Sequence, residues 1–143
     1  MRIKIEGDFS DFTNEWTDDL MINDWFLIPA DSDDDERVYT YEWDTCRCVT
    51  FDDLNYVTAD TVVLPLELTD EMLTLNGFNN NCNIFTIAGF PFDISRNKYR
   101  DPSVYEVMCS GCGVVRTIKY VHELQNILRA CGLDALANNF RIQ

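Results

Sequence analysis

The sequence predicts an α+β fold in which a small SH3-like β-barrel or twisted sheet precedes an α-β-β-β-α unit. Three observations support this. Short β-rich runs separated by acidic turns fill the first half. A capped helix signature follows at mid-chain, and helical periodicity returns only near the C-terminus. With 143 residues, 46% of them hydrophobic, the chain is long enough to bury a core as one compact domain.

The first half is predicted to contain an acidic N-terminal arm and a small acidic β-barrel. The arm covers residues 1–19 and begins with a short strand, and the barrel covers residues 20–66. The barrel strands are expected at residues 20–29, 37–43, 46–51 and 61–66. Residues 37–43 alternate with a period of two, and a proline ends the first run, which is typical of short strands.

The second half, residues 67–143, is predicted to be an α+β unit with a C-terminal amphipathic helix. Thr69 is a good N-cap for a helix over 68–78, and Asn76-Gly77 is typical of its C-terminal end. A strand at 84–90 and a hairpin around "SGCG" follow. The last helix starts after Lys119 and ends at Gly132. Its apolar stripe is formed by Val121, Leu124, Gln125, Leu128 and Cys131.

The formal net charge of −14 is distributed very unevenly. Residues 1–70 hold 19 acidic against 4 basic side chains, a net charge of −15, whereas residues 71–143 hold 6 against 7. Such a field repels phosphates and attracts basic protein surfaces, so direct nucleic-acid binding by the first half is not expected. There is neither a membrane-length apolar run nor a signal-peptide pattern, which predicts a cytoplasmic protein of a bacterial cell with reduced cysteines.

Two cysteine pairs and the only histidine raise the question of chemistry. Cys109 and Cys112 have the spacing of a zinc-ligand pair, and Cys46 with Cys48 would complete four ligands. Cys46 and Cys48 lie within an apparent strand, which argues against a second knuckle. A redox pair would need a helix N-terminus. A nucleophile–base pair with His122 has no third partner in the sequence, and His122 lies off the apolar stripe, so a surface position at the helix start is expected.

The acidic turn has a spacing similar to a calcium loop. Asp31, Asp33 and Asp35 alternate, and Glu42 stands at position twelve, but Glu36 replaces the glycine that the loop requires. A solvated charged turn is therefore the preferred interpretation. No glycine-rich phosphate loop or hydrolase motif is present. The sequence thus predicts no catalytic residue, no metal, no cofactor and no enzymatic activity.

Three segments carry a resemblance: "LMINDWFL", "LPLELTDEMLTLNGF" and "IKYVHELQNILRACGL". The chain resembles an uncharacterised family of small proteins encoded by bacteriophages and mobile elements of gut anaerobes. That family has an L-R-I-G-N-x-V strand, then P-L-T-x-E-x-L-x-x-x-G-F, then Y-V-H-x-L-Q-N. This chain departs from it where Asn23 and Asp24 stand for Gly-Asn, and in its extra acidic arm. The resemblance implies origin and not mechanism.

The same resemblance implies a structural role for the start of the last helix. If "YVHELQN" recurs in the family, His122, Gln125 and Asn126 are expected to hydrogen-bond the turn at 76–78 instead of binding a ligand.

Two classes of function are expected. In the first, the chain is an accessory protein that binds a basic host or phage protein through an acidic face. Such binding would inhibit a nucleic-acid-directed host defence factor by acidic mimicry. The acidic face comprises Asp18, Asp19, Asp31, Asp33, Asp34, Asp35 and Glu36. In the second, the protein sequesters a small molecule or nucleotide through Arg96, Lys98 and Arg100, or is a virion component. The acids would then serve solubility alone.

Overall fold

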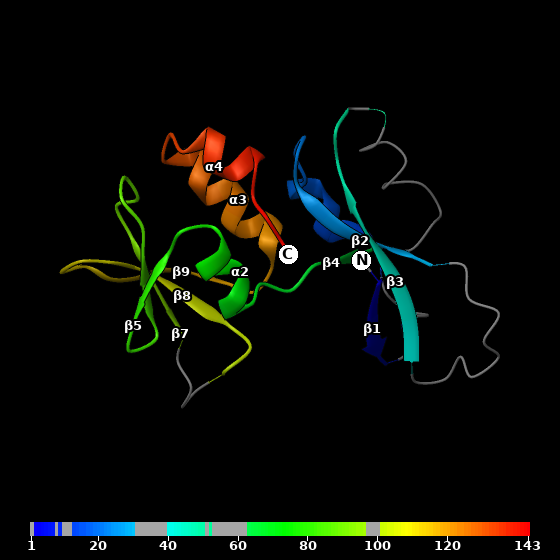
Figure 1. Ribbon diagram of the computed structural model, residues 1–143, viewed down its shortest axis with the longest axis horizontal. Coiled ribbons are helices and arrows are strands. Elements are labelled where there is room, and N and C mark those ends of the chain that lie inside the picture. The colour runs from blue at the N-terminus through cyan, green and yellow to red at the C-terminus, as the bar shows by residue number, and fades with distance from the viewer. Residues whose placement is uncertain are drawn as a thin grey trace. The chain divides into compact units, whose positions relative to one another are not determined.

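The computed structural model describes residues 2–7, 9, 13–30, 40–50, 52, 63–96 and 101–143. The fold is α+β, as predicted, and divides into two compact units (Figure 1). Unit 1 is Met1–Leu66 and unit 2 is Glu67–Gln143. None of the helices in the described part of the chain has the length and apolar content that a membrane crossing requires.

Unit 1 is built on a curled four-stranded antiparallel sheet. Its strands are β1 (Arg2–Glu6), β2 (Trp25–Pro29), β3 (Thr40–Arg47) and β4 (Leu64–Pro65), in the order β1-β3-β2-β4. A short 3-10 helix, η1 (Glu15–Asp19), precedes β2. The N-terminal segment is thus part of the sheet, because β1 pairs with β3 along its whole length. The short strand predicted at the start of the chain is thus β1, and it belongs to this sheet.

The two predicted strands at 37–43 and 46–51 are also corrected, because β3 runs without a break from Thr40 to Arg47. Asp44 stands between the two predicted strands. It lies opposite Arg2 on one side and Ile28 on the other, and it pairs with the Arg2 guanidinium. A charged residue is tolerated in this strand because a charge of opposite sign stands directly across from it.

One core cluster of unit 1 contains sulfur. Its buried members are Leu20, Phe26, Cys48 and Val63, with Trp16, Ile28 and Cys46 packed against them. Two aromatic residues of the N-terminal segment, Phe9 and Trp16, pack within the same unit. The Phe9 ring meets Trp43 edge-on, with ring centroids 5.8 Å apart.

Unit 2 contains a five-stranded antiparallel meander and three helices. Its elements are α2 (Asp70–Leu75), β5 (Asn79–Asn81), β6 (Ile84–Thr86), β7 (Asp93–Arg96), β8 (Tyr105–Cys109), β9 (Gly113–Ile118), α3 (Val121–Ala130) and α4 (Asp134–Asn138). The prediction of three strands missed β5 and β7. β5 consists of asparagines alone, and β7 has one apolar residue, Ile94, so neither shows an alternating pattern.

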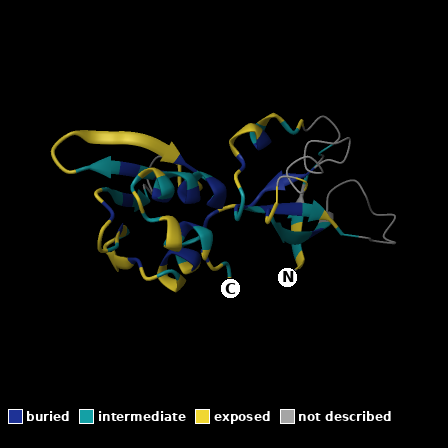
Figure 2. Cartoon of the chain, turned by 90° about the horizontal axis from the view of Figure 1, so that it is seen from above, coloured by how far each residue is buried: buried dark blue, intermediate teal, exposed yellow. Residues whose placement is uncertain are grey.

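The predicted helix caps and apolar stripe are confirmed. Thr69 Oγ1 accepts a hydrogen bond from Met72 N at 3.2 Å, and Gly77 has a φ of 94°, which only glycine adopts readily. On α3, Val121, Leu124, Gln125 and Leu128 are buried, and Cys131 is half-buried. Strand β9, in contrast, is exposed over most of its length, from Gly113 to Thr117 (Figure 2).

Candidate functional site

Unit 1 carries nearly all of the excess negative charge. Residues 1–66 hold 17 acidic against 4 basic side chains, a net charge of −13, whereas residues 67–143 hold 8 against 7, a net charge of −1. Even if every basic side chain of unit 1 neutralised one acid, most acids would keep their charge. Unit 1 is therefore the main source of the protein's electrostatic field.

The basic side chains of β1 are already used within the sheet. Arg2 lies opposite Asp44, and Lys4 lies opposite Glu42. Arg2 Nη1 is 3.4 Å from Glu42 Oε2, Arg2 Nε is 3.5 Å from Asp44 Oδ1, and Lys4 Nζ is 3.7 Å from Glu42 Oε1. Such exposed pairs add little stability. They do neutralise the acids of β3, so the excess charge of unit 1 comes from its other acids.

A second group of acids lies on η1. Its exposed acids are Glu15, Asp18 and Asp19. The helix is attached to the core by Trp16, whose Nε1 donates to Val63 O at 3.3 Å, and by Asn14 Oδ1, which accepts from Val63 N at 3.2 Å. The two predicted partner-binding acids of this helix are thus presented to solvent from an anchored element.

The other predicted partner-binding acids lie outside the described residues. They are Asp31, Asp33, Asp34, Asp35 and Glu36. Of the calcium-like spacing only Glu42 is described, and it pairs with the cations of β1. Among the described residues, no three His, Cys, Asp or Glu side chains are grouped so that they would hold a metal ion.

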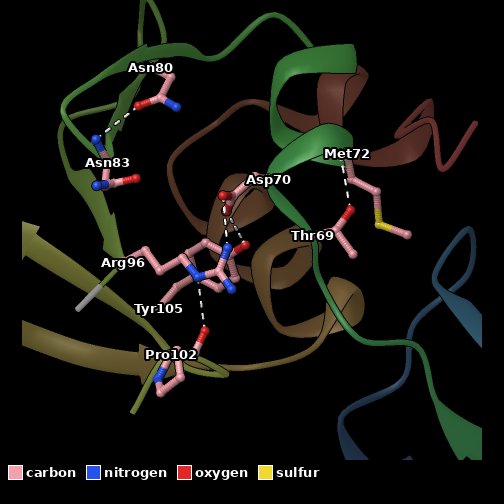
Figure 3. Close-up of polar contacts among 8 residues, drawn as sticks. All are labelled: Thr69, Asp70, Met72, Asn80, Asn83, Arg96, Pro102 and Tyr105. Atoms are coloured by element: carbon pink, nitrogen blue, oxygen red, sulfur yellow. Dashed lines mark hydrogen bonds and ion pairs between the residues drawn. The ribbon is translucent and has the colours of Figure 1, made fainter. Parts of the chain in front are cut away.

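The clearest polar cluster of unit 2 joins Asp70, Arg96 and Tyr105 (Figure 3). Asp70 is the first residue of α2, Arg96 the last of β7 and Tyr105 the first of β8. Arg96 Nη1 donates to Asp70 Oδ2 at 2.8 Å, and the Tyr105 hydroxyl donates to Asp70 Oδ1 at 2.6 Å. Both carboxylate oxygens therefore have a donor.

An open cleft of about 460 Å³ surrounds this cluster. The described residues that line it include the carboxylates of Glu67, Asp70 and Glu71 and one guanidinium, that of Arg96. Arg96 Nε also donates to Pro102 O at 2.9 Å, so two of its donor positions are occupied. This described lining is negative overall and disfavours a phosphate group.

The pKa shifts in the cluster favour a structural role. Burial, followed by the hydrogen bond to Asp70, raises the pKa of Tyr105 above its ordinary value. The hydrogen bond to Asp70 likewise raises the pKa of Arg96. General acid–base groups have pKa values tuned toward neutrality. Here the donors are held protonated instead, and they tie the start of α2 to β7 and β8.

The predicted ligand-binding alternative is only partly described. Arg96 lies in the cleft, while Lys98 and Arg100 fall outside the described residues. The Arg96 guanidinium already donates hydrogen bonds to Asp70 and to Pro102 O, so it is poorly suited to be the main phosphate ligand.

His122 is buried, with 3% of its surface exposed, which corrects the expected surface position. It stands three residues before the fully buried Gln125, so the buried face of α3 is wide enough to include both. The His122 ring also stacks on Tyr120, with centroids 6.0 Å apart. Of the two thiols that a nucleophile–base pair with His122 would use, Cys109 is half-buried and Cys112 is exposed.

Two other polar residues of α3 have partners on α4 and on α3 itself. Gln125 Nε2 donates to Ala137 O of α4 at 2.9 Å, and Asn126 Oδ1 accepts from Arg129 Nη1 of the same helix at 2.9 Å. The turn after α2 has a partner near the C-terminus. Asn76 Nδ2 donates to Arg141 O at 2.7 Å, and Asn76 Oδ1 accepts from Arg141 N at 2.8 Å. The Gln125 bond thus ties α3 to α4, and the Asn76 bonds tie the turn to the C-terminal segment.

The predicted hairpin around "SGCG" is confirmed, because β8 and β9 pair and Cys112 N donates to Cys109 O at 3.1 Å. Cys46 lies on β3, and the buried Cys48 is the first residue after that strand. All four cysteines are free thiols.

Sequence reasoning missed the partnership of Asp70 and Tyr105. The local sequence marks Asp70 only as an acid that suits a helix N-terminus, and no local pattern marks a tyrosine 35 residues later as its donor. Comparison of the chain with protein-family models, curated proteins and solved structures found no match.

Proposed function

We propose that this protein is a non-enzymatic accessory protein of a bacteriophage or integrated mobile element, which acts in the host cytoplasm by binding a basic protein surface. The observation that supports this proposal is the concentration of charge: a net −13 on unit 1 beside −1 on unit 2. The phage origin rests on the resemblance of the three segments described above.

The acidic face and the phosphate backbone of a nucleic acid are both negatively charged, and this shared charge suggests the class of target. Proteins that act on nucleic acids present basic grooves to phosphates, and an anchored set of carboxylates offers charges of the same sign. The acids of η1 are held by Trp16 and Asn14, so they do not need to be ordered on binding. The target we propose is therefore a nucleic-acid-directed host defence factor, inhibited by acidic mimicry.

The sequestration alternative has less support. A nucleotide would have to enter a cleft in whose described lining carboxylates outnumber the Arg96 guanidinium, which is itself bound to Asp70. Nothing described favours a virion role.

The experiment is affinity capture from a bacterial lysate by three proteins. They are the wild type, an acidic-turn variant and a matched unit 2 variant. The acidic-turn variant carries Asp31→Asn, Asp33→Asn, Asp34→Asn and Asp35→Asn. The control carries Glu71→Gln, Asp93→Asn, Glu106→Gln and Asp134→Asn, and so removes the same number of charges from unit 2.

The wild type and the control should capture the same basic protein at low salt, and the acidic-turn variant should capture much less. Duplex DNA added to the beads should release the captured protein, because both compete for one surface. The mimicry would be contradicted if both variants captured equally little of this protein, or if the captured protein stayed on the beads in the presence of excess DNA. Tight binding of the wild type itself to DNA would contradict it as well.

A further inference from the structure

The β8–β9 hairpin carries two thiols at the ends of one β-turn. The hydrogen bond from Cys112 N to Cys109 O, 3.1 Å long, places the cysteines at the first and fourth turn positions, with Cα atoms within about 7 Å. Gly111, at the third position, has a φ of 80°, and Gly113 follows with 86°. This C-x-x-C spacing in a tight turn is that of a zinc-ligand pair.

The same tight turn carries both thiols. Cys109 is half-buried and Cys112 exposed, and neither forms a disulfide. In a C-x-x-C turn one metal ion binds both sulfurs, and each sulfur loses its proton on binding.

The hairpin supplies only half of a zinc site. Structural zinc is bound by four ligands in a tetrahedron, with Zn–S distances of about 2.3 Å. In the part of the chain that the structure describes, no further His, Cys, Asp or Glu completes such a group. The sequence argument against zinc concerned four ligands from one chain, and two identical hairpins would supply four thiolates.

The strand beside the turn is suited to meet a second copy. β9 lies at the edge of the five-stranded sheet and pairs with β8 alone. Its residues from Gly113 to Thr117 are exposed (Figure 2), and Val114 and Val115 are 50% and 56% exposed. An exposed edge with apolar side chains favours strand or surface pairing. In a two-fold dimer joined at the turns, these valines would lie next to the metal.

We propose that two copies of this chain bind one zinc ion between their β8–β9 hairpins, through Cys109 and Cys112 of each copy. The interface is isologous, because each copy contributes the same residues. Each sulfur loses its proton as it bonds to the metal, and no oxidation occurs. Zinc binding therefore releases protons and weakens as the pH falls.

The test is sedimentation velocity of the full chain during a zinc titration, in a phosphine reductant that does not compete for zinc. The wild type should become dimeric and saturate at about one zinc ion per two chains. A chelator should return it to the monomer. C109S and C112S should each remain monomeric, while C82S, which removes another exposed thiol, should behave as the wild type.

A titration with Co²⁺ provides an independent readout on the unaltered chain, because four thiolates around Co²⁺ give strong sulfur-to-metal absorption. A wild type that stays monomeric at saturating zinc would overturn the proposal. So would about one zinc ion per monomer, or a dimer that resists the chelator and dissociates only with reductant, which would be a disulfide.

Discussion

Tyr105 donates a hydrogen bond of 2.6 Å to Asp70, a residue 35 positions earlier in the chain, and so fixes the first turn of α2 to the start of β8. Arg96 holds the second carboxylate oxygen at 2.8 Å (Figure 3). Tyr105 is almost fully buried, at 2% exposure, whereas the Asp70 side chain is 29% exposed. The bond therefore lies at the edge of the core. Removing the hydroxyl tests its contribution to the free energy of unfolding without creating a large cavity.

Tyr105→Phe removes this hydroxyl alone. We expect the free energy of unfolding to fall by about 1 kcal/mol, below the usual value for a bond to a charged group because water still reaches Asp70. Urea denaturation measures the change. Ser103→Ala is the matched control, since it removes a hydroxyl bonded to Asp101 at the same 2.6 Å in an exposed loop. An equal effect of both substitutions would contradict the special role of Tyr105.

Tyr105 also predicts a pH dependence. Burial and the bond to Asp70 raise its pKa, so above about pH 10 the unfolded chain loses this proton while the folded chain keeps it. The folded state then binds more protons, and the free energy of unfolding falls as the pH rises through that value. Urea denaturation in steps from about pH 8 to about pH 11 should show a smaller decline for Tyr105→Phe than for the wild type. Parallel declines would show that another group is responsible.

Local signals predicted the elements that local chemistry determines. Thr69 and Gly77 marked the ends of α2, and the stripe from Val121 to Leu128 marked α3. The bond between Tyr105 and Asp70 could not be predicted in this way, because it depends on how β7 and β8 return to α2. β5 was missed for a related reason: its asparagines pair through their backbone, which leaves no side-chain pattern.

Leu73 and Leu124 test the core of unit 2. Both are fully buried, one on α2 and the other on α3. Replacing either with Ala should lower the free energy of unfolding by about 2–4 kcal/mol, through lost transfer energy and the cavity left behind. Leu75→Ala is the control on the same helix as Leu73. Because Leu75 is 36% exposed, this substitution should lower the free energy of unfolding much less. Melting of the Leu73 and Leu124 variants at the wild-type temperature would show that the core is misplaced.

Asn23 occupies a backbone conformation that favours glycine. Its φ is 73°, and its N–H donates to Cys48 O. Asn23→Gly should change the free energy of unfolding by less than about 0.5 kcal/mol, since relief of backbone strain offsets the greater freedom of the unfolded chain. Asn23→Val should lower it by about 1–2 kcal/mol. Equal thermal stability of the two variants would argue against this conformation. Glycine at this position is also what the family pattern of the resemblance contains.

The acidic turn predicts a kinetic effect on binding. Charges on unit 1 attract a basic partner over distances of about 10 Å at 0.1 M salt, so they act mainly on the association rate. Neutralising Asp31, Asp33, Asp34 and Asp35 to Asn should slow association with the captured protein severalfold and change its dissociation little. Thermal stability should stay the same or rise slightly, because like charges are removed. Stopped-flow mixing at increasing salt should bring the two association rates together. If the protein binds a ligand instead, these four changes should leave the association rate unaffected. Substitution of Arg96, Lys98 or Arg100 should then weaken binding. That outcome would exclude the acidic face as the binding surface.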